Sequence, residues 1–348
     1  MRDWSERLAE WVPPKDWRRV VSVDAHTEGE PLRVIVGGYP ELEGDSILAR
    51  RQDASMNHDG MRRALMWEPR GHADMYGCIV VPPVTPKADI GVLFTHNDGF
   101  STMCGHGIIG VTTVLIEVGL APDTAVTHGL GIDTPAGYVH AKPTIRNGRV
   151  ERVSFVNVPS YLARADARVL VDGVGEVRYD LAYGGAFYAY VAASDFGLRL
   201  EAAEADQLID LGSRIKHAVQ ETGPPTHPGG SDLEFVYGTI FVGDPHDSRH
   251  HSRNVCVFAG GELDRSPTGT GVSGRLAIHH ARGEIRGDEE IVIESILGTC
   301  FSGRVVGTAC VGAHDAVIPE VSGGARITGR HEFLIDPADP LWDGFVLR

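Results

Sequence analysis

The sequence MCGHG at residues 103–107 begins an apolar stretch, and DRSPTGTG at residues 264–271 begins a second stretch of the same kind. Cys104 in the first copy and Thr268 in the second each lie 15 positions before a glycine that closes the stretch. A short apolar run and a tight turn come before each copy. The chain therefore predicts the order strand, turn, glycine-rich start and helix twice, with a thiol at one helix start and a hydroxyl at the other.

Length and pattern around these two copies indicate the fold class. A chain of 348 residues is long for one hydrophobic core, so two domains are expected. Helices are expected over about 46–67 and 202–220, beside a short amphipathic helix within 1–19. Most other segments read as short strands bounded by turn residues. This predominance of strands favours an α+β architecture over a doubly wound parallel sheet.

Composition and charge exclude several classes of function. The net charge of −15 argues against a nucleic-acid surface, because phosphate binding needs clustered lysine and arginine. The five cysteines are odd in number and far apart, which favours a reducing, cytoplasmic compartment over a disulfide framework. The N-terminal residues do not resemble a signal peptide, and no apolar run is long enough to span a membrane.

The apolar character of the first helix indicates an anion site at its start. Apolar residues lie on all its sides, so we expect it to be buried. A buried helix needs partners for its first N–H groups, and Gly105 and Gly107 allow a ligand to approach the backbone. Gly269 and Gly271 repeat this design in the second helix. Two such helix starts facing one ligand would suit a small carboxylate without an arginine.

Three side chains near these helix starts are candidates for chemistry. Cys104 is expected at the first helical position, where the helix N-terminus would lower its pKa and favour a thiolate that acts as nucleophile or base. His106 could donate to a ligand or to Thr270, or it could serve in capping and packing. Asp264 could accept from a cationic nitrogen of a ligand, or it could only bond its own turn.

Other motifs give no sign of a metal or a cofactor. His246, His250 and His251 lie in a polar loop whose spacing fits no tight metal-binding template. The sequence contains no phosphate-binding loop, no dinucleotide-binding glycine pattern after a strand, and no serine nucleophile elbow. We therefore expect neither a metal nor a cofactor.

Three segments together resemble the proline racemase family. DAHTEGEP at 24–31 resembles the family's D-x-H-T-G-G-E-P signature, with Glu28 in place of a glycine. MCGHG resembles the first catalytic block, and DRSPTGTG resembles the second except at Thr268, where racemases and hydroxyproline epimerases carry a cysteine. The combination of Cys104 with Thr268 is typical of the trans-3-hydroxy-L-proline dehydratases. ESILGT and DPLWDGF also resemble that subgroup.

The resemblance implies a fold of two pseudo-symmetric lobes like that of diaminopimelate epimerase. Each lobe would be a mostly antiparallel sheet or barrel around a central helix, with the active site in the cleft between the lobes. Residues 20–157 and 337–348 would form the first lobe, and residues 158–336 the second. Residues 1–19 would form an N-terminal extension.

The resemblance also implies dehydration of trans-3-hydroxy-L-proline to pyrroline-2-carboxylate without a cofactor. Cys104 would remove the α-proton, and Thr268 would bond the 3-hydroxyl group or guide its departure. The remaining predicted contacts bind the substrate, and they are Gly105, His106, Asp264, Gly269, Thr270 and Asp232. Leu233 replaces a histidine that is common in relatives acting on 4-hydroxyproline.

Two alternatives to the dehydratase stay open at this point. One is a proline or hydroxyproline racemase or epimerase, and the other is a non-catalytic binder of proline-like amino acids. In each case the partner is a small amino acid, not a nucleic acid or a membrane. A homodimer is an open possibility.

Overall fold

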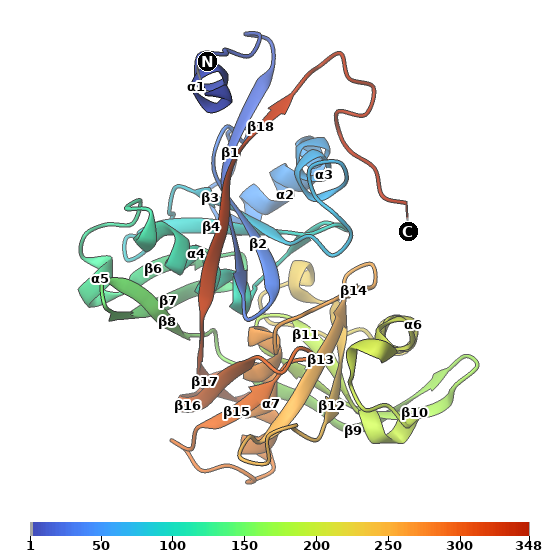
Figure 1. Cartoon of the computed structure of the whole chain (residues 1–348). Coiled ribbons are helices and arrows are strands. Elements are labelled where there is room, and N and C mark those ends of the chain that lie inside the picture. The colour runs from blue at the N-terminus through green and yellow to red at the C-terminus, as the bar shows by residue number, and fades with distance from the viewer. Residues whose placement is uncertain (1–2, 348) are drawn as a thin grey trace.

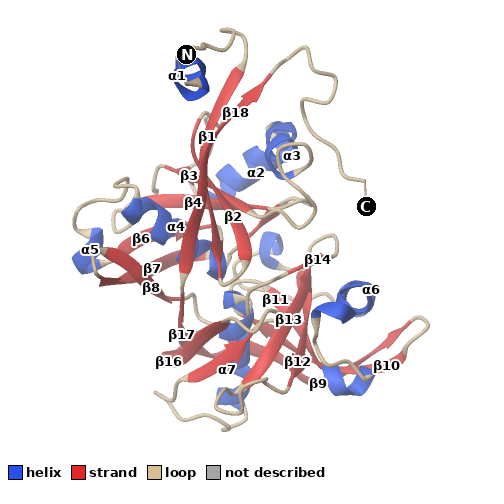
Figure 2. Cartoon of the chain, viewed as in Figure 1, coloured by secondary structure: helices blue, strands red, loops and turns tan. Residues whose placement is uncertain are grey.

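Two lobes make up the computed structural model, which describes residues 3–347. In each lobe, strands curve around one central helix (Figure 1). This helix is α4 (Gly105–Glu117) in the first lobe and α7 (Gly269–Ala281) in the second. Both helices contain 13 residues. Helices are few beside the strands (Figure 2), as the sequence pattern predicts.

The first lobe contains the N-terminal strands and most of the shorter helices. Its elements are β1 (Arg18–Thr27), β2 (Glu30–Gly37), α2 (Ile47–Asn57), α3 (Asp59–Met66), β3 (Gly77–Val81), β4 (Ile90–Thr95), β5 (Phe100–Ser101), α4, α5 (Ala125–His128), β6 (Leu130–Thr134), β7 (Gly137–Arg146) and β8 (Arg149–Val156). The long helix expected over 46–67 is divided at His58, whose backbone leaves the helical region and separates α2 from α3.

The second lobe follows the same plan with α6 as its outer helix. Its elements are β9 (Tyr161–Val171), β10 (Gly175–Tyr183), β11 (Phe187–Ala192), η1 (Ala193–Phe196), η2 (Ala202–Glu204), α6 (Ala205–Thr222), η3 (Ser231–Leu233), β12 (Val236–Gly243), β13 (Ser252–Phe258), β14 (Glu262–Leu263), α7, β15 (Ile291–Glu294), β16 (Cys300–Val311) and β17 (His314–Gly323).

The strand pairings repeat in the same order in both lobes. In the first lobe, β2 pairs parallel with β3, β3 antiparallel with β4, and β4 parallel with β6, after which β6, β7 and β8 run antiparallel. In the second lobe, β11, β12, β13, β15, β16 and β17 repeat these pairings in the same order. The predicted α+β fold with two pseudo-symmetric, mostly antiparallel lobes is confirmed.

The chain crosses between the lobes at β8 and returns at its C-terminal end. β8 pairs antiparallel with β17, which joins the two sheets. β18 (Ala325–Ile335) pairs with β1 from Thr27 back to Arg18, so residues 325–335 lie in the first lobe. The predicted boundary assigned them to the second lobe. Most of β18 is exposed, so its sequence carries no alternation of apolar residues that would indicate which lobe it joins.

The N-terminal extension contributes little to the core. α1 (Trp4–Ala9) has no buried residue, so the amphipathic helix expected within 1–19 is short and exposed. Among the residues that the structure describes, no helix is long and apolar enough to cross a membrane.

The two central helices meet end to end through glycines. A Cβ atom added to Gly105 would lie 2.5 Å from the Cα atom of Gly269, and one added to Gly269 would lie 2.7 Å from the Cα atom of Gly105. Real Cβ atoms do not approach backbone this closely, so only glycine fits at either position. This contact brings the two helix starts to the same place in the cleft.

We expect Gly105→Ala to separate the two helix starts and to lower both activity and stability. Relieving a backbone clash in a packed core costs about 1–3 kcal/mol. Gly99→Ala is the matched control, because a Cβ atom at Gly99 meets nothing within 4 Å. Thermal unfolding and turnover of both variants provide the measurement. Wild-type stability and turnover in Gly105→Ala would show that the contact does not constrain the site.

Candidate active site

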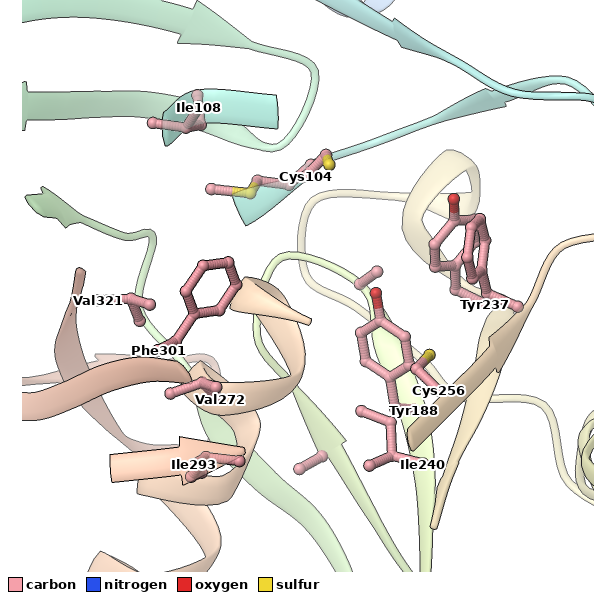
Figure 3. Packing of buried hydrophobic residues seen from close by; sticks show 14 of the residues in the cluster. Cys104, Ile108, Tyr188, Tyr237, Ile240, Cys256, Val272, Ile293, Phe301 and Val321 are labelled. Carbon is pink, nitrogen blue, oxygen red and sulfur yellow. The ribbon is translucent and has the colours of Figure 1, made fainter. Parts of the chain in front are cut away.

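A small cavity lies between the lobes at the meeting point of α4 and α7. It is nearly closed, with a volume of about 10 Å³, which is room for about one water molecule. Seven residues predicted from the sequence line it, namely Cys104, Gly105, His106, Asp264, Thr268, Gly269 and Thr270. The lining also includes Tyr76, Met103, Tyr188, Tyr237 and Phe258. Figure 3 shows Tyr188 and Tyr237 with their hydroxyl groups directed to the side where Cys104 lies.

Free backbone donors are concentrated at the two helix starts. Within residues 3–347, the N–H groups of Gly105, His106, Gly269 and Thr270 have no acceptor. Buried N–H groups nearly always have a partner, so four free donors beside one cavity indicate a ligand with several acceptor oxygens. The positive ends of both helix dipoles favour a negative charge there.

Cys104 lies just before the first helix and not inside it. It is the N-cap residue of α4, with an extended backbone, and not the first helical residue that the sequence pattern predicts. Its Sγ atom accepts a hydrogen bond from the Gly107 N–H at 3.2 Å and lies 3.2 Å from His106 Nδ1. The sulfur therefore occupies the capping position that an oxygen usually takes.

Burial raises the pKa of the Cys104 thiol well above its ordinary value, which corrects the predicted lowering. The nearby Tyr76 hydroxyl and the hydrogen bond from the Gly107 N–H lower this pKa, but they offset only part of the desolvation. The negative charges of Asp264 and Glu30 raise it further. Burial also lowers the pKa of His106 to about 4, so this imidazole is neutral at physiological pH.

Each lobe contributes one half-site, which is the start of its central helix with the residue before it, Cys104 in the first lobe and Thr268 in the second. Thr268 breaks the symmetry between the two half-sites. Its backbone has φ +64°, a conformation that β-branched residues rarely adopt, at a cost of about 1–3 kcal/mol. Its hydroxyl does not cap α7 but donates to Asp264 Oδ2 at 2.7 Å. Asp264 Oδ1 in turn accepts from the Ser266 N–H at 2.7 Å. Thr268 and Asp264 thus form one fixed unit opposite Cys104.

Sequence reasoning missed the aromatic wall of the cavity. Tyr188 Oη lies 2.8 Å from Thr270 Oγ1, which fixes the threonine at the start of α7. The rings of Tyr76 and His106 meet edge to face, with their centroids 4.6 Å apart. Tyr76, Tyr188 and Tyr237 belong to no motif, and only their positions on or beside short apolar strands mark them. The fold alone brings them together.

The structure does not bring Asp232 into the cavity with the other predicted residues. Asp232 lies in η3 and accepts a hydrogen bond from Gln52 Nε2 of the first lobe at 2.9 Å. Arg265 makes a second contact across the cleft, with Asp74 at 2.9 Å. These polar contacts link the lobes beside the cavity, and among residues 3–347 no arginine lines the cavity itself.

The family of the chain follows from comparison with known proteins. The model of the family described as proline racemase matches residues 22–346. The chain belongs to the proline racemase family. The trans-3-hydroxy-L-proline dehydratase of Colwellia psychrerythraea is 46% identical over 98% of this chain and 97% of that protein. The 3-hydroxyproline 2-epimerase of Burkholderia multivorans is 43% identical over 95% of this chain and 99% of that protein.

Solved structures of the family share the fold. The structure of a hydroxyproline epimerase from Agrobacterium vitis with bound trans-4-hydroxy-L-proline superposes with a TM-score of 0.89 and 32% identity. The match covers 95% of this chain and 96% of that chain. The family and the two-lobed fold predicted from the sequence motifs are therefore confirmed.

The pKa of Cys104 is open to a direct test. Because burial raises it, alkylation of Cys104 by iodoacetamide should still accelerate with pH beyond the thiol's ordinary value of 9.0. Cys310, which is exposed, serves as the internal control, and mass spectrometry of both peptides measures the two rates separately. A rate at Cys104 that levels off below about pH 7 would instead show a thiolate stabilised by the helix start.

Proposed function

We propose that this protein dehydrates trans-3-hydroxy-L-proline to pyrroline-2-carboxylate without a cofactor. The observation that carries the proposal is a cavity with a thiol on one side and a threonine on the other. Inversion of an α-carbon needs a proton-transfer group on each face, and the Thr268 hydroxyl is far too weak an acid or base to replace a thiol. One thiol suffices when the substrate carries its own leaving group.

The cavity offers a partner for each charged group of this substrate. The free N–H groups at Gly105, His106, Gly269 and Thr270 would hold the carboxylate. Asp264 would hold the ring ammonium group, because its carboxylate lies at the cavity beside Thr268. Cys104 would then face the α-carbon. Asp232 pairs with Gln52 outside the cavity, so we do not expect it to touch the substrate.

The reaction then proceeds with Cys104 as the base. The substrate ammonium group brings a positive charge into the cavity, which favours the thiolate form of Cys104. The thiolate removes the α-proton, and the donors on the carboxylate stabilise the negative charge that develops, each by about 3–4 kcal/mol if well aligned. The 3-hydroxyl group leaves as water. The resulting enamine tautomerises to the cyclic imine.

A 3-hydroxyproline 2-epimerase is the second candidate, favoured by the similarity to the Burkholderia multivorans enzyme. That activity would need a proton delivered to the face opposite Cys104. The Thr268 hydroxyl, which the pseudo-symmetry of the lobes relates to the Cys104 thiol, is bonded to Asp264. We therefore rank this activity below dehydration.

We also propose a small amino acid of the hydroxyproline type as the physiological partner, and a cytoplasmic location. All five cysteines are free, which suits a reducing compartment. The homodimer stays a prediction.

A substrate panel tests the proposed function. L-Proline and the 3-hydroxy and 4-hydroxy isomers should be assayed for the cyclic imine and, by chiral chromatography, for inversion. We expect imine only from trans-3-hydroxy-L-proline and no inversion of L-proline. Cys104→Ser should retain less than about a tenth of the rate, a barrier increase above about 1.4 kcal/mol, whereas Cys78→Ser alters a buried thiol outside the cavity and should keep its activity. Efficient racemisation of L-proline by the wild type would contradict the proposal.

A further inference from the structure

One buried hydroxyl group at the cavity has no partner. Tyr237 in β12 is only 7% exposed and lines the cavity. Its Oη atom has no hydrogen-bond partner of good geometry among the described residues. Leaving a buried polar group unpaired costs about 1–3 kcal/mol, so such a group at the wall of a ligand site indicates a contact with the ligand.

Surrounding rings hold Tyr237 in this position. Its ring lies 5.5 Å from that of Phe258, 5.8 Å from that of His96 and 5.8 Å from that of Tyr188, measured between centroids. Figure 3 shows the hydroxyl directed to the side where Cys104 lies. The packing of its ring, and not a hydrogen bond, therefore fixes the direction of the Tyr237 hydroxyl.

Tyr76 lines the cavity together with Tyr237 and the Cys104 thiol. Tyr76 Oη lies 2.6 Å from Ser101 Oγ, and the Tyr76 hydroxyl is near enough to Cys104 to lower the pKa of the thiol against the larger effect of burial. Burial raises the pKa of Tyr237 well above its ordinary value, but Tyr76 and Ser101 are near enough for their hydroxyls to lower it. Cys104, Tyr76 and Tyr237 therefore line one cavity, and among the described residues the Tyr76 hydroxyl is hydrogen-bonded to Ser101 alone.

The stereochemistry of the substrate decides which side the leaving group faces. In trans-3-hydroxy-L-proline the carboxylate and the 3-hydroxyl lie on opposite faces of the ring, so the α-hydrogen and the 3-hydroxyl lie on the same face. The base that removes the α-hydrogen therefore also faces the leaving group. The pseudo-symmetry of the lobes relates Cys104 to Thr268, which places Thr268 at the opposite face with its hydroxyl already donated to Asp264. This argues against the contact between Thr268 and the 3-hydroxyl that the resemblance implied.

We propose that the Tyr237 hydroxyl binds the 3-hydroxyl group of the substrate and protonates it as it leaves. The inference rests on the proposed function. Cys104 takes the α-proton, and the electron pair of the C–H bond becomes the C2–C3 double bond. The C3–O bond breaks with its electrons on oxygen, which takes the Tyr237 proton and leaves as water. After product release, Tyr237 takes up a proton from solvent and the Cys104 thiol gives one up, which restores both groups.

Two readouts on Tyr237→Phe separate this role from a structural one. Dehydration of trans-3-hydroxy-L-proline should fall by about 100-fold or more, the usual contribution of a general acid. Exchange of the α-proton of L-proline with heavy water, followed by NMR, should stay within about twofold of the wild type, because that step needs Cys104 but no leaving group. Retained exchange also shows that the variant is folded.

Tyr161→Phe is the matched control. Tyr161 in β9 is also a buried tyrosine whose hydroxyl has no partner among the described residues, and it lies outside the cavity. Both rates should remain at the wild-type level in this variant.

The outcomes separate failure of the inference from failure of the proposed function. A wild type that forms no cyclic imine would overturn the proposed function itself. If the wild type forms the imine and Tyr237→Phe keeps more than half of that rate, Tyr237 is not the acid. Parallel loss of dehydration and of proline exchange would also overturn the inference, since it would assign Tyr237 a packing role.

Discussion

The active site depends on the contact between Gly105 and Gly269. Because neither position has a Cβ atom, two buried helices begin at the same point, and their unpaired N–H groups converge on one small cavity. Every other feature of the site is arranged around that point. Cys104 and Thr268 immediately precede the two helices, and the two lobes repeat the same strand order to bring the helices there.

Within this symmetric frame, the chemistry is asymmetric. Cys104 has a relaxed extended backbone, and its sulfur caps its own helix. Thr268 has a strained backbone with positive φ, and its hydroxyl is bonded to Asp264. On the proposed function, the first half-site would exchange a proton and the second would hold the substrate. Burial opposes ionisation of the thiol, which makes the charge of the bound substrate part of the activation.

Much of this arrangement was predictable from local sequence. Paired glycines come before both helices, the apolar first stretch predicts a buried helix, and the spacing of the two copies predicts a duplicated fold. The remaining features depend on long-range packing. The tyrosines come from strands with no shared motif, and the raised pKa of Cys104 results from how completely the lobes enclose it. β18 is too exposed to show which strand it joins, and the backbone conformation of Thr268 follows from its turn.

A structure of the protein in complex with pyrrole-2-carboxylate tests the central claim most directly. This ligand is planar at the carbon that corresponds to the α-carbon and so resembles the deprotonated substrate. We expect its carboxylate oxygens to accept hydrogen bonds from the N–H groups of Gly105 and His106 on one side and of Gly269 and Thr270 on the other, at about 2.7–3.2 Å. The ring should lie between Cys104 and Thr268. A carboxylate bound instead by an arginine side chain, or a ring outside the space between the two helix starts, would contradict the account.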